Sequence, residues 1–233
     1  MPCSVTLQVD LTMDYLQARS NMIEQQVRPW DVLDQRVLDV LNEVPREAFV
    51  SPAQSGIAYS DYPLPIGHGQ HMLKPTLDGR LVQALALDAA DSVLEIGTGS
   101  GYLTACIARL ARRCESLEIV LELANSAMSR LERQGYDNVN VHQRDAATGV
   151  SDDDHYDAIL FGGSVPRVPE RYRRLLVVGG RLVAVIGHAE RPTMEAVLLT
   201  RVGREEWVTE SLFDTHVDPL VSFSSTVPPA FVF

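Results

Sequence analysis

The sequence contains little cysteine and no apolar run long enough to cross a membrane. Its three cysteines, Cys3, Cys106 and Cys114, form neither a CxxC pair nor the Cys/His spacing of a metal site. An odd number of cysteines without a disulfide framework is typical of a reducing compartment. The first twelve residues lack the basic and apolar segments of a signal peptide. We therefore expect a soluble, cytoplasmic protein without a metal site.

Positive charge is also scarce. Twenty Lys and Arg residues stand against 31 Asp and Glu residues, which gives a formal net charge of −11. A protein that binds nucleic acid through its overall charge needs a basic face to neutralise phosphates. The composition therefore argues against a nucleic-acid partner. A length of 233 residues suits one large domain, or a core domain with an appendage.

The N-terminal third predicts helices that are interrupted by an irregular segment. Apolar residues recur with helical period over residues 14–27, and Pro29 is expected to end that helix. Asp31 is expected to cap a second helix, with Val32 and Leu33 on its apolar face. Residues 45–75 are rich in proline, glycine and aromatics, which predicts an ordered loop of the kind that carries binding residues. Pro75 suits the first turn of a third helix.

From Asp91 onward the pattern changes to alternating strands and helices. Such alternation predicts an α/β fold with a mostly parallel sheet covered on both faces, a doubly wound sheet. Gly203 lies between two segments that read as a C-terminal antiparallel hairpin. We expect an extension over residues 1–12, a helical and loop cap over 13–90, and the core over 91–233. The expected strands span 92–97, 138–143, 156–163 and 179–187, residues 116–122 are expected to be a strand that passes into a loop, and the expected helices span 101–113, 124–135 and 169–177.

Three glycines, Gly97, Gly99 and Gly101, lie between the first expected strand of the core and the following helix. Without side chains, they let a ligand approach the backbone and the free N–H groups at the helix start. The dinucleotide pattern G-x-G-x-x-G/A would need a small residue at position 102, where this chain has tyrosine. The Gly-Lys-Ser/Thr of a phosphate-binding loop is absent as well. The motif therefore indicates another nucleoside ligand.

Acidic residues follow two further strands. Glu118 comes 21 residues after Gly97, and a carboxylate there can accept hydrogen bonds from both ribose hydroxyls. Asp145 follows the third strand, where it could meet the exocyclic amine of adenine. Glu95 stands two residues before the first glycine. Together these residues predict a site for an adenosine-containing cofactor.

This set resembles the class I S-adenosylmethionine-dependent methyltransferases. The resemblance implies a Rossmann-like sheet of seven strands that binds S-adenosyl-L-methionine. It places the methionine part at the glycines, the ribose at Glu118 and the adenine at Asp145. The cofactor-binding residues it implies are Glu95, Gly97, Thr98, Gly99, Gly101, Glu118, Asp145 and Ala146.

The segments "VLDVLNEVPREAFV", "AYSDYPLPIGHGQ" and "DSVLEIGTGSGY" resemble, in order and spacing, the protein-L-isoaspartate O-methyltransferases. The likeness covers residues 20 to 190. It implies that a carboxylate of a protein or peptide is the acceptor, at isoaspartyl residues of damaged proteins. A carboxylate is already ionised at neutral pH, so the reaction needs positioning rather than a strong base. The resemblance also implies that Asp61, Ile66, Gln70 and His71 contact the substrate.

The chain departs from that family directly after Gly69-Gln70. Where the family typically has Thr-Ile-Ser-x-Pro, this chain has His71, Met72, Leu73, Lys74 and Pro75. Leu73 stands at the position of the family's active-site serine and cannot donate a hydrogen bond. His71 could donate instead, which makes His71 and Leu73 the candidate catalytic positions, and Lys74 could attract a carboxylate. Two alternatives stay open: a methyltransferase with a different acceptor, and a catalytically silent protein that binds the cofactor.

Overall fold

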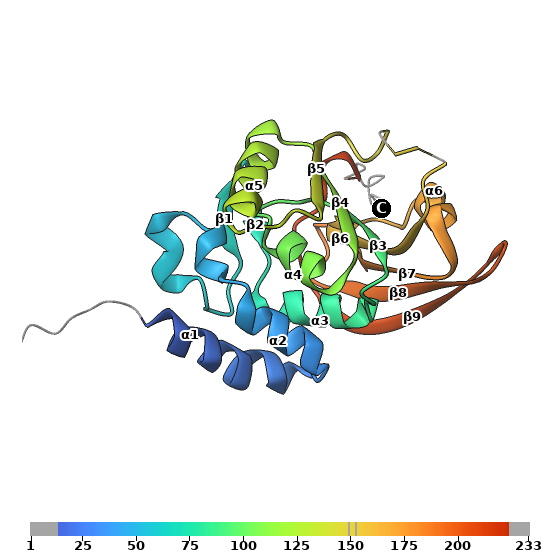
Figure 1. The fold of residues 1–233 in the computed structure, drawn as a ribbon. Helices are drawn as coiled ribbons and strands as arrows, with labels where there is room; N and C mark the ends of the chain where they lie inside the picture. Colours follow the sequence, from blue (N-terminus) through green and yellow to red (C-terminus); the bar gives the residue numbers. More distant parts are fainter. Residues whose placement is uncertain (1–13, 149, 152, 224–233) are drawn as a thin grey trace, which may run out of the picture.

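The computed structural model describes residues 14–148, 150–151 and 153–223, and the expected extension over residues 1–12 lies outside these ranges. Its centre is a seven-stranded sheet in the order β5-β4-β3-β6-β7-β8-β9 (Figure 1). The strands are β3 (Ser92–Ile96), β4 (Arg113–Glu118), β5 (Val139–Gln143), β6 (Tyr156–Val165), β7 (Leu176–Ile186), β8 (Met194–Gly203) and β9 (Glu206–Thr215). The five strands from β5 to β7 are parallel, and β8 and β9 add an antiparallel edge. The predicted mostly parallel sheet and its C-terminal hairpin are thus confirmed.

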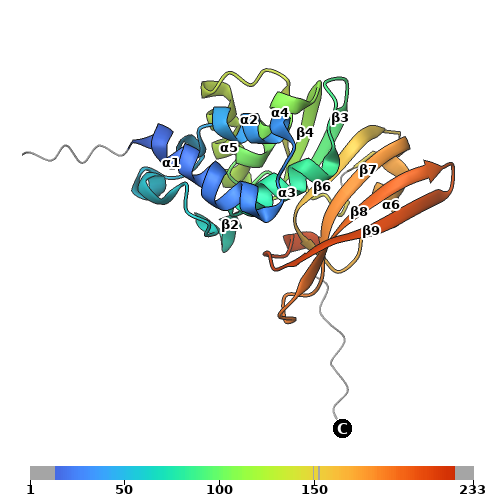
Figure 2. The same cartoon turned by 90° about the horizontal axis from the view of Figure 1, so that it is seen from below.

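Helices cover both faces of this sheet. They are α1 (Tyr15–Met22), α2 (Gln35–Glu43), α3 (Pro75–Leu85), α4 (Tyr102–Leu110), α5 (Leu121–Arg133) and α6 (Glu170–Leu175). Successive residues of a strand point to opposite faces, so each strand contributes to two cores. In β3, Val93 packs with α2–α5, whereas Leu94 and Ile96 pack with the residues of α6. The sheet is doubly wound, as the sequence predicts, and Figure 2 shows the N-terminal helices gathered beside it.

The start of α2 differs from the prediction. Asp34, not Asp31, is the N-cap, and its Oδ1 accepts a hydrogen bond from the backbone N–H of Arg36 at 2.9 Å. Asp31 ends a short 3₁₀ turn, η2 (Arg28–Trp30), which contains the Pro29 that was expected to stop the first helix. Leu33 is 70% exposed rather than part of an apolar face. The prediction failed because Gln83 of α3 holds this turn through hydrogen bonds to its backbone.

The segment over residues 45–75 is ordered, as expected, and contains short elements. Two 3₁₀ turns, η3 (Arg46–Phe49) and η4 (Pro52–Ile57), precede a small antiparallel ribbon of β1 (Leu64–Gly67) and β2 (Gln70–Met72). Arg46 ties the segment to α3 and is fully buried. Its guanidinium donates to the carbonyl of Ala58 at 2.7 Å and to that of Leu73, and it forms a 2.5 Å ion pair with Asp78.

After β9 the chain returns to the parallel part of the sheet. We call residues 216–223 the C-terminal segment. Ser164 of β6 fixes it, because the Ser164 N–H donates to the Asp218 carbonyl at 2.8 Å and its carbonyl accepts from Leu220 N–H at 3.0 Å. The Phe223 ring packs edge-on against Phe161 of β6 and Tyr172 of α6. The segment therefore runs across the carboxyl end of β6, next to the loop after β3.

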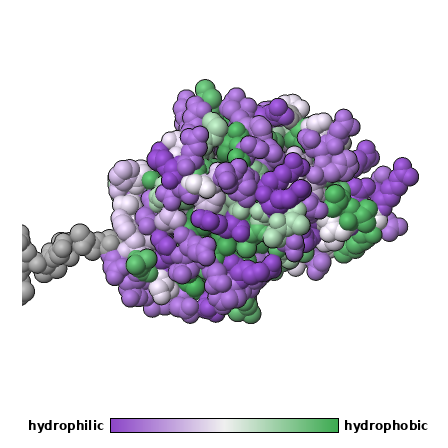
Figure 3. All heavy atoms as spheres, viewed as in Figure 1, coloured by the Kyte–Doolittle hydropathy of each residue, from purple (hydrophilic) through white to green (hydrophobic). Residues whose placement is uncertain are grey.

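Hydrophilic residues cover most of the molecular face seen in Figure 3, and its hydrophobic residues form separate groups. Among the helices that the structure describes, none is both long and apolar enough to cross a membrane.

Candidate active site

The loop after β3 bends sharply at its glycines. Gly97, Gly99 and Gly101 have φ of +91°, +54° and +87°, a region that favours glycine. We call residues 97–101 the glycine loop. A Cβ at position 97 would lie 2.8 Å from Leu220 Cδ2 of the C-terminal segment, so no other residue fits there without a shift. Gly101 differs, because the absence of its side chain lets the start of α4 pack against Ala127 of α5.

Glu118 lies at the end of β4 and faces this loop. Its side chain is buried and accepts two backbone hydrogen bonds, from Gly99 N–H at 2.8 Å and from Val120 N–H at 3.0 Å. These bonds fix the glycine loop against the adjacent strand end. A carboxylate held in this way can accept a hydroxyl of a ligand with its remaining lone pairs.

Glu95 lies beneath the glycine loop rather than beside a cavity. It is fully buried, and its Oε2 accepts from Thr104 Oγ1 at 2.5 Å and from Ser116 Oγ at 2.6 Å. Burial raises its pKa to about 7, against the effect of these two hydroxyls. Its Oε1 has no hydrogen-bond partner among the described residues. Thr98, also buried, extends the network through a 2.6 Å bond between its Oγ1 and Ser116 Oγ.

A narrow cavity of about 70 Å³ lies directly above the loop. It is lined by Gly97 and Gly99, the turn after β4 (117–120), Gly162 and Gly163 of β6, and residues 218–223. Of the sequence-predicted residues, the structure brings Ile66, Gln70, His71, Leu73, Gly97, Gly99, Glu118 and Ala146 to its wall. Glu95, Thr98, Gly101, Asp61 and Asp145 are not part of this wall.

Asp145 and Ala146, both expected to bind the cofactor, lie in different surroundings. Ala146 is buried at the wall of the narrow cavity, and its carbonyl accepts from Tyr172 Oη at 2.5 Å. Asp145 is half-buried, and its Oδ1 accepts from the backbone N–H of Ala147 at 2.8 Å. Asp145 therefore orders the turn after β5 in this structure.

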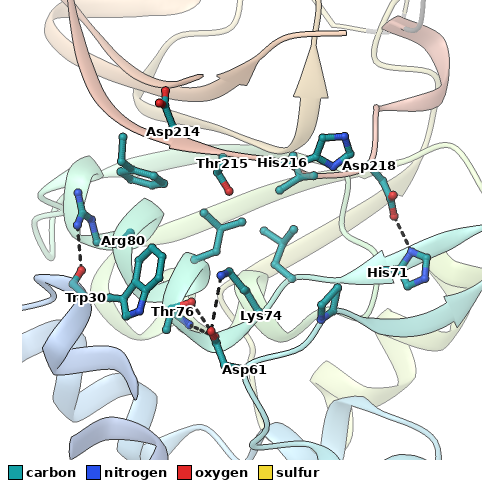
Figure 4. A pocket seen from close by; sticks show the side chains of 15 residues that line it. Trp30, Asp61, His71, Lys74, Thr76, Arg80, Asp214, Thr215, His216 and Asp218 are labelled. Atoms are coloured by element: carbon teal, nitrogen blue, oxygen red, sulfur yellow. Dashed lines mark hydrogen bonds and ion pairs between the residues drawn. The ribbon is translucent and has the colours of Figure 1, made fainter. Parts of the chain in front are cut away.

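A wide cavity of about 550 Å³ opens beside the narrow one (Figure 4). Its walls are Trp30, Asp61, the start of α3 with the residues before it, and residues 213–218 after β9. Two cations lie over aromatic rings at its rim: Lys74 Nζ is 4.7 Å from the Trp30 ring centre, and Arg80 is 4.4 Å from that of Phe213. The volume and the mixture of aromatic, basic and acidic side chains suit a polar organic ligand.

Asp61 is the polar anchor of one wall. Its Oδ1 accepts from Thr76 Oγ1 at 2.7 Å, and its Oδ2 lies 3.6 Å from Lys74 Nζ (Figure 4). Tyr59, two residues earlier, is buried and bonded to Arg19 and Glu47, so it orders the loop rather than facing a cavity.

The two cavities meet at three residues, His71, Leu73 and Asp218, which line both. His71 Nδ1 lies 2.7 Å from Asp218 Oδ2 (Figure 4). Leu73 offers only its apolar side chain, because its carbonyl is held by Arg46. Leu73 and Met72 also pack against the hydrophobic core, so this turn has a structural role beside its place in the cavity wall.

Several residues of the wide cavity were missed from the sequence. Trp30 is 50% exposed at the cavity rim, and no sequence pattern marks it as a binding residue. In the sequence, Arg80 is one of several charged residues on a helix and belongs to no motif. No pattern singles out Asp218 either. By contrast, His68 in the β1–β2 turn is exposed and lines neither cavity, as its position between two glycines suggests.

Comparisons with known proteins point to one family. The family model described as protein-L-isoaspartate(D-aspartate) O-methyltransferase matches residues 17–222. The protein-L-isoaspartate O-methyltransferase of Rhodopseudomonas palustris is 39% identical over 86% of this chain and 91% of its own. Protein-L-isoaspartate O-methyltransferase 2 of Pelobacter propionicus is 40% identical over 87% of this chain and 90% of its own.

The fold has a counterpart among solved structures. A Plasmodium falciparum protein described as a protein-L-isoaspartate O-methyltransferase, crystallised with S-adenosyl-L-homocysteine, superimposes with a TM-score of 0.74. The likeness covers 90% of this chain and 99% of that one at 22% sequence identity, and therefore concerns the fold.

Proposed function

The chain belongs to the protein-L-isoaspartate(D-aspartate) O-methyltransferase family, and we propose that it methylates the free carboxylate of isoaspartyl residues in damaged proteins, with S-adenosyl-L-methionine as methyl donor. One observation carries this proposal: the narrow cavity above a glycine loop that Glu118 fixes meets a cavity of about 550 Å³ at His71, Leu73 and Asp218. The activity shared by the named relatives supports it over a different acceptor or a silent cofactor-binding protein.

The residues of the narrow cavity fit S-adenosyl-L-methionine. The backbone of Gly97 and Gly99 would hold its methionine part, Glu118 its ribose hydroxyls, and the turn with Asp145 and Ala146 its adenine. The unpartnered Oε1 of Glu95 beneath the loop leaves one buried acceptor for a polar group or water on that side. The bound cofactor supplies a methyl group that is already activated by its positive sulfur.

Leu220 closes this cavity. Ligand sites generally exceed about 300 Å³, whereas the narrow cavity measures about 70 Å³. Leu220 lines this cavity, and its Cδ2 lies close to both Gly97 and Gly163. We therefore expect the Leu220 side chain to turn aside when the cofactor binds.

The acceptor would enter through the wide cavity. Its carboxylate is ionised at neutral pH, so the protein has to orient it and exclude water rather than remove a proton. Of the four expected substrate contacts, Asp61 lines the wide cavity, Ile66 and Gln70 line the narrow one, and His71 lines both. Lys74 adds a positive charge 3.6 Å from Asp61 at the far wall.

The division of the chain and its location are part of the proposal. Residues 13–90 would form the cap and 91–233 the core, and the buried cluster that joins Leu38 and Leu41 of α2 to Val93 of β3 supports a cap packed on that core. The buried free thiols of Cys106 and Cys114 support a reducing, cytoplasmic location. A protein or peptide carboxylate would be the partner, and the charge of −11 argues against nucleic acid.

The test is a methyl-transfer assay with labelled S-adenosyl-L-methionine, an isoaspartyl peptide and its normal aspartyl twin. The product is a methyl ester, and it is measured as the labelled methanol that base releases from it. We expect transfer to the isoaspartyl peptide alone. If the protein binds S-adenosyl-L-homocysteine in a melting scan but esterifies neither peptide, the acceptor has changed. If no thermal shift occurs at a hundredfold excess over the expected dissociation constant, where about 2.7 kcal/mol is predicted, the cofactor assignment is wrong.

A further inference from the structure

The place where the two cavities meet has an unusual charge for a site that receives a carboxylate. Of its three shared residues, Leu73 is apolar and Asp218 is acidic. An acceptor carboxylate that approaches this point meets the negative charge of Asp218, which repels it. His71 is the one shared residue that can donate a hydrogen bond or carry a positive charge. The protonation state of its ring therefore decides whether this junction accepts or rejects an anion.

Asp218 fixes that ring. An ionised carboxylate only accepts hydrogen bonds, so the 2.7 Å contact requires a proton on His71 Nδ1. In the neutral ring Nε2 then carries a lone pair and cannot donate to a carboxylate. Nε2 becomes a donor only when the ring is protonated on both nitrogens. The doubly protonated ring and the Asp218 carboxylate at 2.7 Å would form an ion pair without net charge.

Building on the proposed function, we propose that a His71–Asp218 ion pair is the carboxylate-recognition element of the acceptor site. His71, in its cationic form, donates Nε2–H to the isoaspartyl carboxylate, and Asp218 is the positioning residue that holds the ring. The pair supplies the hydrogen bond that Leu73 lacks. Specificity for a negatively charged acceptor then depends on one proton.

Three other charged side chains near the pair, Lys74, Arg80 and Glu118, have partners of their own. Lys74 faces Asp61 at 3.6 Å, and Arg80 donates to the Trp30 carbonyl at 2.9 Å and lies 3.5 Å from Asp31. Glu118 accepts two backbone N–H groups. The titratable and charged groups that line the two cavities beside the pair are Asp61, Lys74, Arg80, Asp214 and His216 in the wide cavity and Glu118 and Arg144 in the narrow one. Asp218, at 2.7 Å, is the charge in direct contact with His71.

Binding tests this proposal without turnover. Trp30 lies at the wall of the wide cavity, and in a Trp207→Phe background it is the sole tryptophan of the chain. Its fluorescence reports binding of an isoaspartyl peptide, and of the twin whose free carboxylate is a carboxamide, to protein saturated with S-adenosyl-L-homocysteine. We expect the carboxylate peptide to bind more tightly than the carboxamide twin, and its binding to weaken about tenfold per pH unit once the ring has lost its proton. The carboxamide peptide should bind weakly at every pH.

Two substitutions separate the roles. His71→Asn should remove the pH dependence and weaken carboxylate binding about tenfold to a hundredfold, the value of a hydrogen bond to a charged group. Asp218→Asn retains an oxygen for Nδ1–H but removes the charge, so the loss of binding should move to lower pH. In the methyl-transfer assay the same shift should appear in kcat/KM. A merely structural role would change stability and leave the pH profile in place.

His142 offers a matched control. Its Nε2 lies 2.6 Å from Glu115 Oε2 on the surface of β5, and it lines neither cavity. His142→Asn should leave the binding profile unchanged. The proposal is wrong if His71→Asn keeps the wild-type profile, or if the carboxylate peptide shows no advantage over its carboxamide at any pH. If the carboxylate peptide binds with this pH profile but is not methylated, the recognition element stands and the proposed function is wrong. If the peptide is methylated and both variants keep the wild-type pH profile, the proposed function stands and the recognition element is wrong.

Discussion

The two cavities that meet at His71 differ in the groups that line them. The narrow cavity is made of backbone, glycines and strand ends, and the buried carboxylate of Glu118 fixes its loop through two backbone hydrogen bonds. The wide cavity is made of long side chains from segments that are far apart in the chain, and its central pair of His71 and Asp218 is about 40% exposed. The first is a rigid frame for one ligand, whereas the second can change its specificity by exchanging a few side chains. This contrast explains how the chain keeps the family's cofactor motif while it departs at residues 71–74.

The largest effect is expected when the frame of the narrow cavity is broken. Glu118→Ala removes the acceptor of the Gly99 and Val120 N–H groups, and hydrogen bonds to a charged group contribute about 1.5–3 kcal/mol each. We expect affinity for S-adenosyl-L-homocysteine to fall at least a hundredfold, as measured by calorimetry. Glu122→Ala, at an exposed position in the first turn of α5, should bind as the wild type does. Equal affinity in the two variants would refute the role of Glu118.

The next largest effect concerns the buried Arg46, which holds the carbonyl of Leu73 in the wall of the wide cavity. Arg46→Met leaves the buried carboxylate of Asp78 without its partner, and the loss of one member of a buried ion pair costs about 3–5 kcal/mol. Urea unfolding should show this decrease in the free energy of unfolding. Arg174→Met breaks an exposed pair with Glu170 and should cost less than about 1 kcal/mol. An equal loss of unfolding free energy in the two variants would mean that burial does not make the Arg46–Asp78 pair more important for stability than the exposed pair.

Glu95, beneath the narrow cavity, should make the free energy of unfolding depend on pH. Burial raises the pKa of Glu95 from 4.5, its ordinary value, to about 7, so the folded state binds the proton more tightly. Stability should therefore fall as pH rises from 4.5 to 7, by up to about 3 kcal/mol for this group. Glu95→Gln should flatten that part of the profile in urea unfolding at several pH values, and Glu122→Gln should leave it unaltered. A profile that is equally steep without Glu95 would assign the pH dependence to another group.

The sequence predicted the frame far better than the side-chain cavity. Strand and helix periodicity, the glycines and the acids at strand ends are local patterns, and the sheet and the positions of Glu118 and Gly97 follow from them. Asp218 and Trp30 come from segments that meet the loop before α3 only in the folded protein, so no local pattern brings them together.

The error at α2 has the same cause. Gln83 of α3 accepts hydrogen bonds from the backbone N–H groups of Leu33 and Asp34 and donates to the Asp31 carbonyl at 2.9 Å. These contacts hold a turn where the sequence pattern alone favours a helix.

The smallest expected effect separates backbone strain from close packing. Gly97 and Gly135 both have positive φ, +91° and +76°, so alanine at either position costs about 1 kcal/mol of backbone strain. At Gly135, which ends α5, a Cβ meets no atom within 4 Å, whereas at Gly97 it would lie 2.8 Å from Leu220 Cδ2. We therefore expect Gly97→Ala to cost about 1–2 kcal/mol more than Gly135→Ala in urea unfolding, because overpacking adds to the strain. Leu220→Ala should recover most of that difference, since it removes the clashing methyl groups. If the double variant gains nothing, Leu220 does not close the narrow cavity in solution, and the cofactor has free access to the glycine loop.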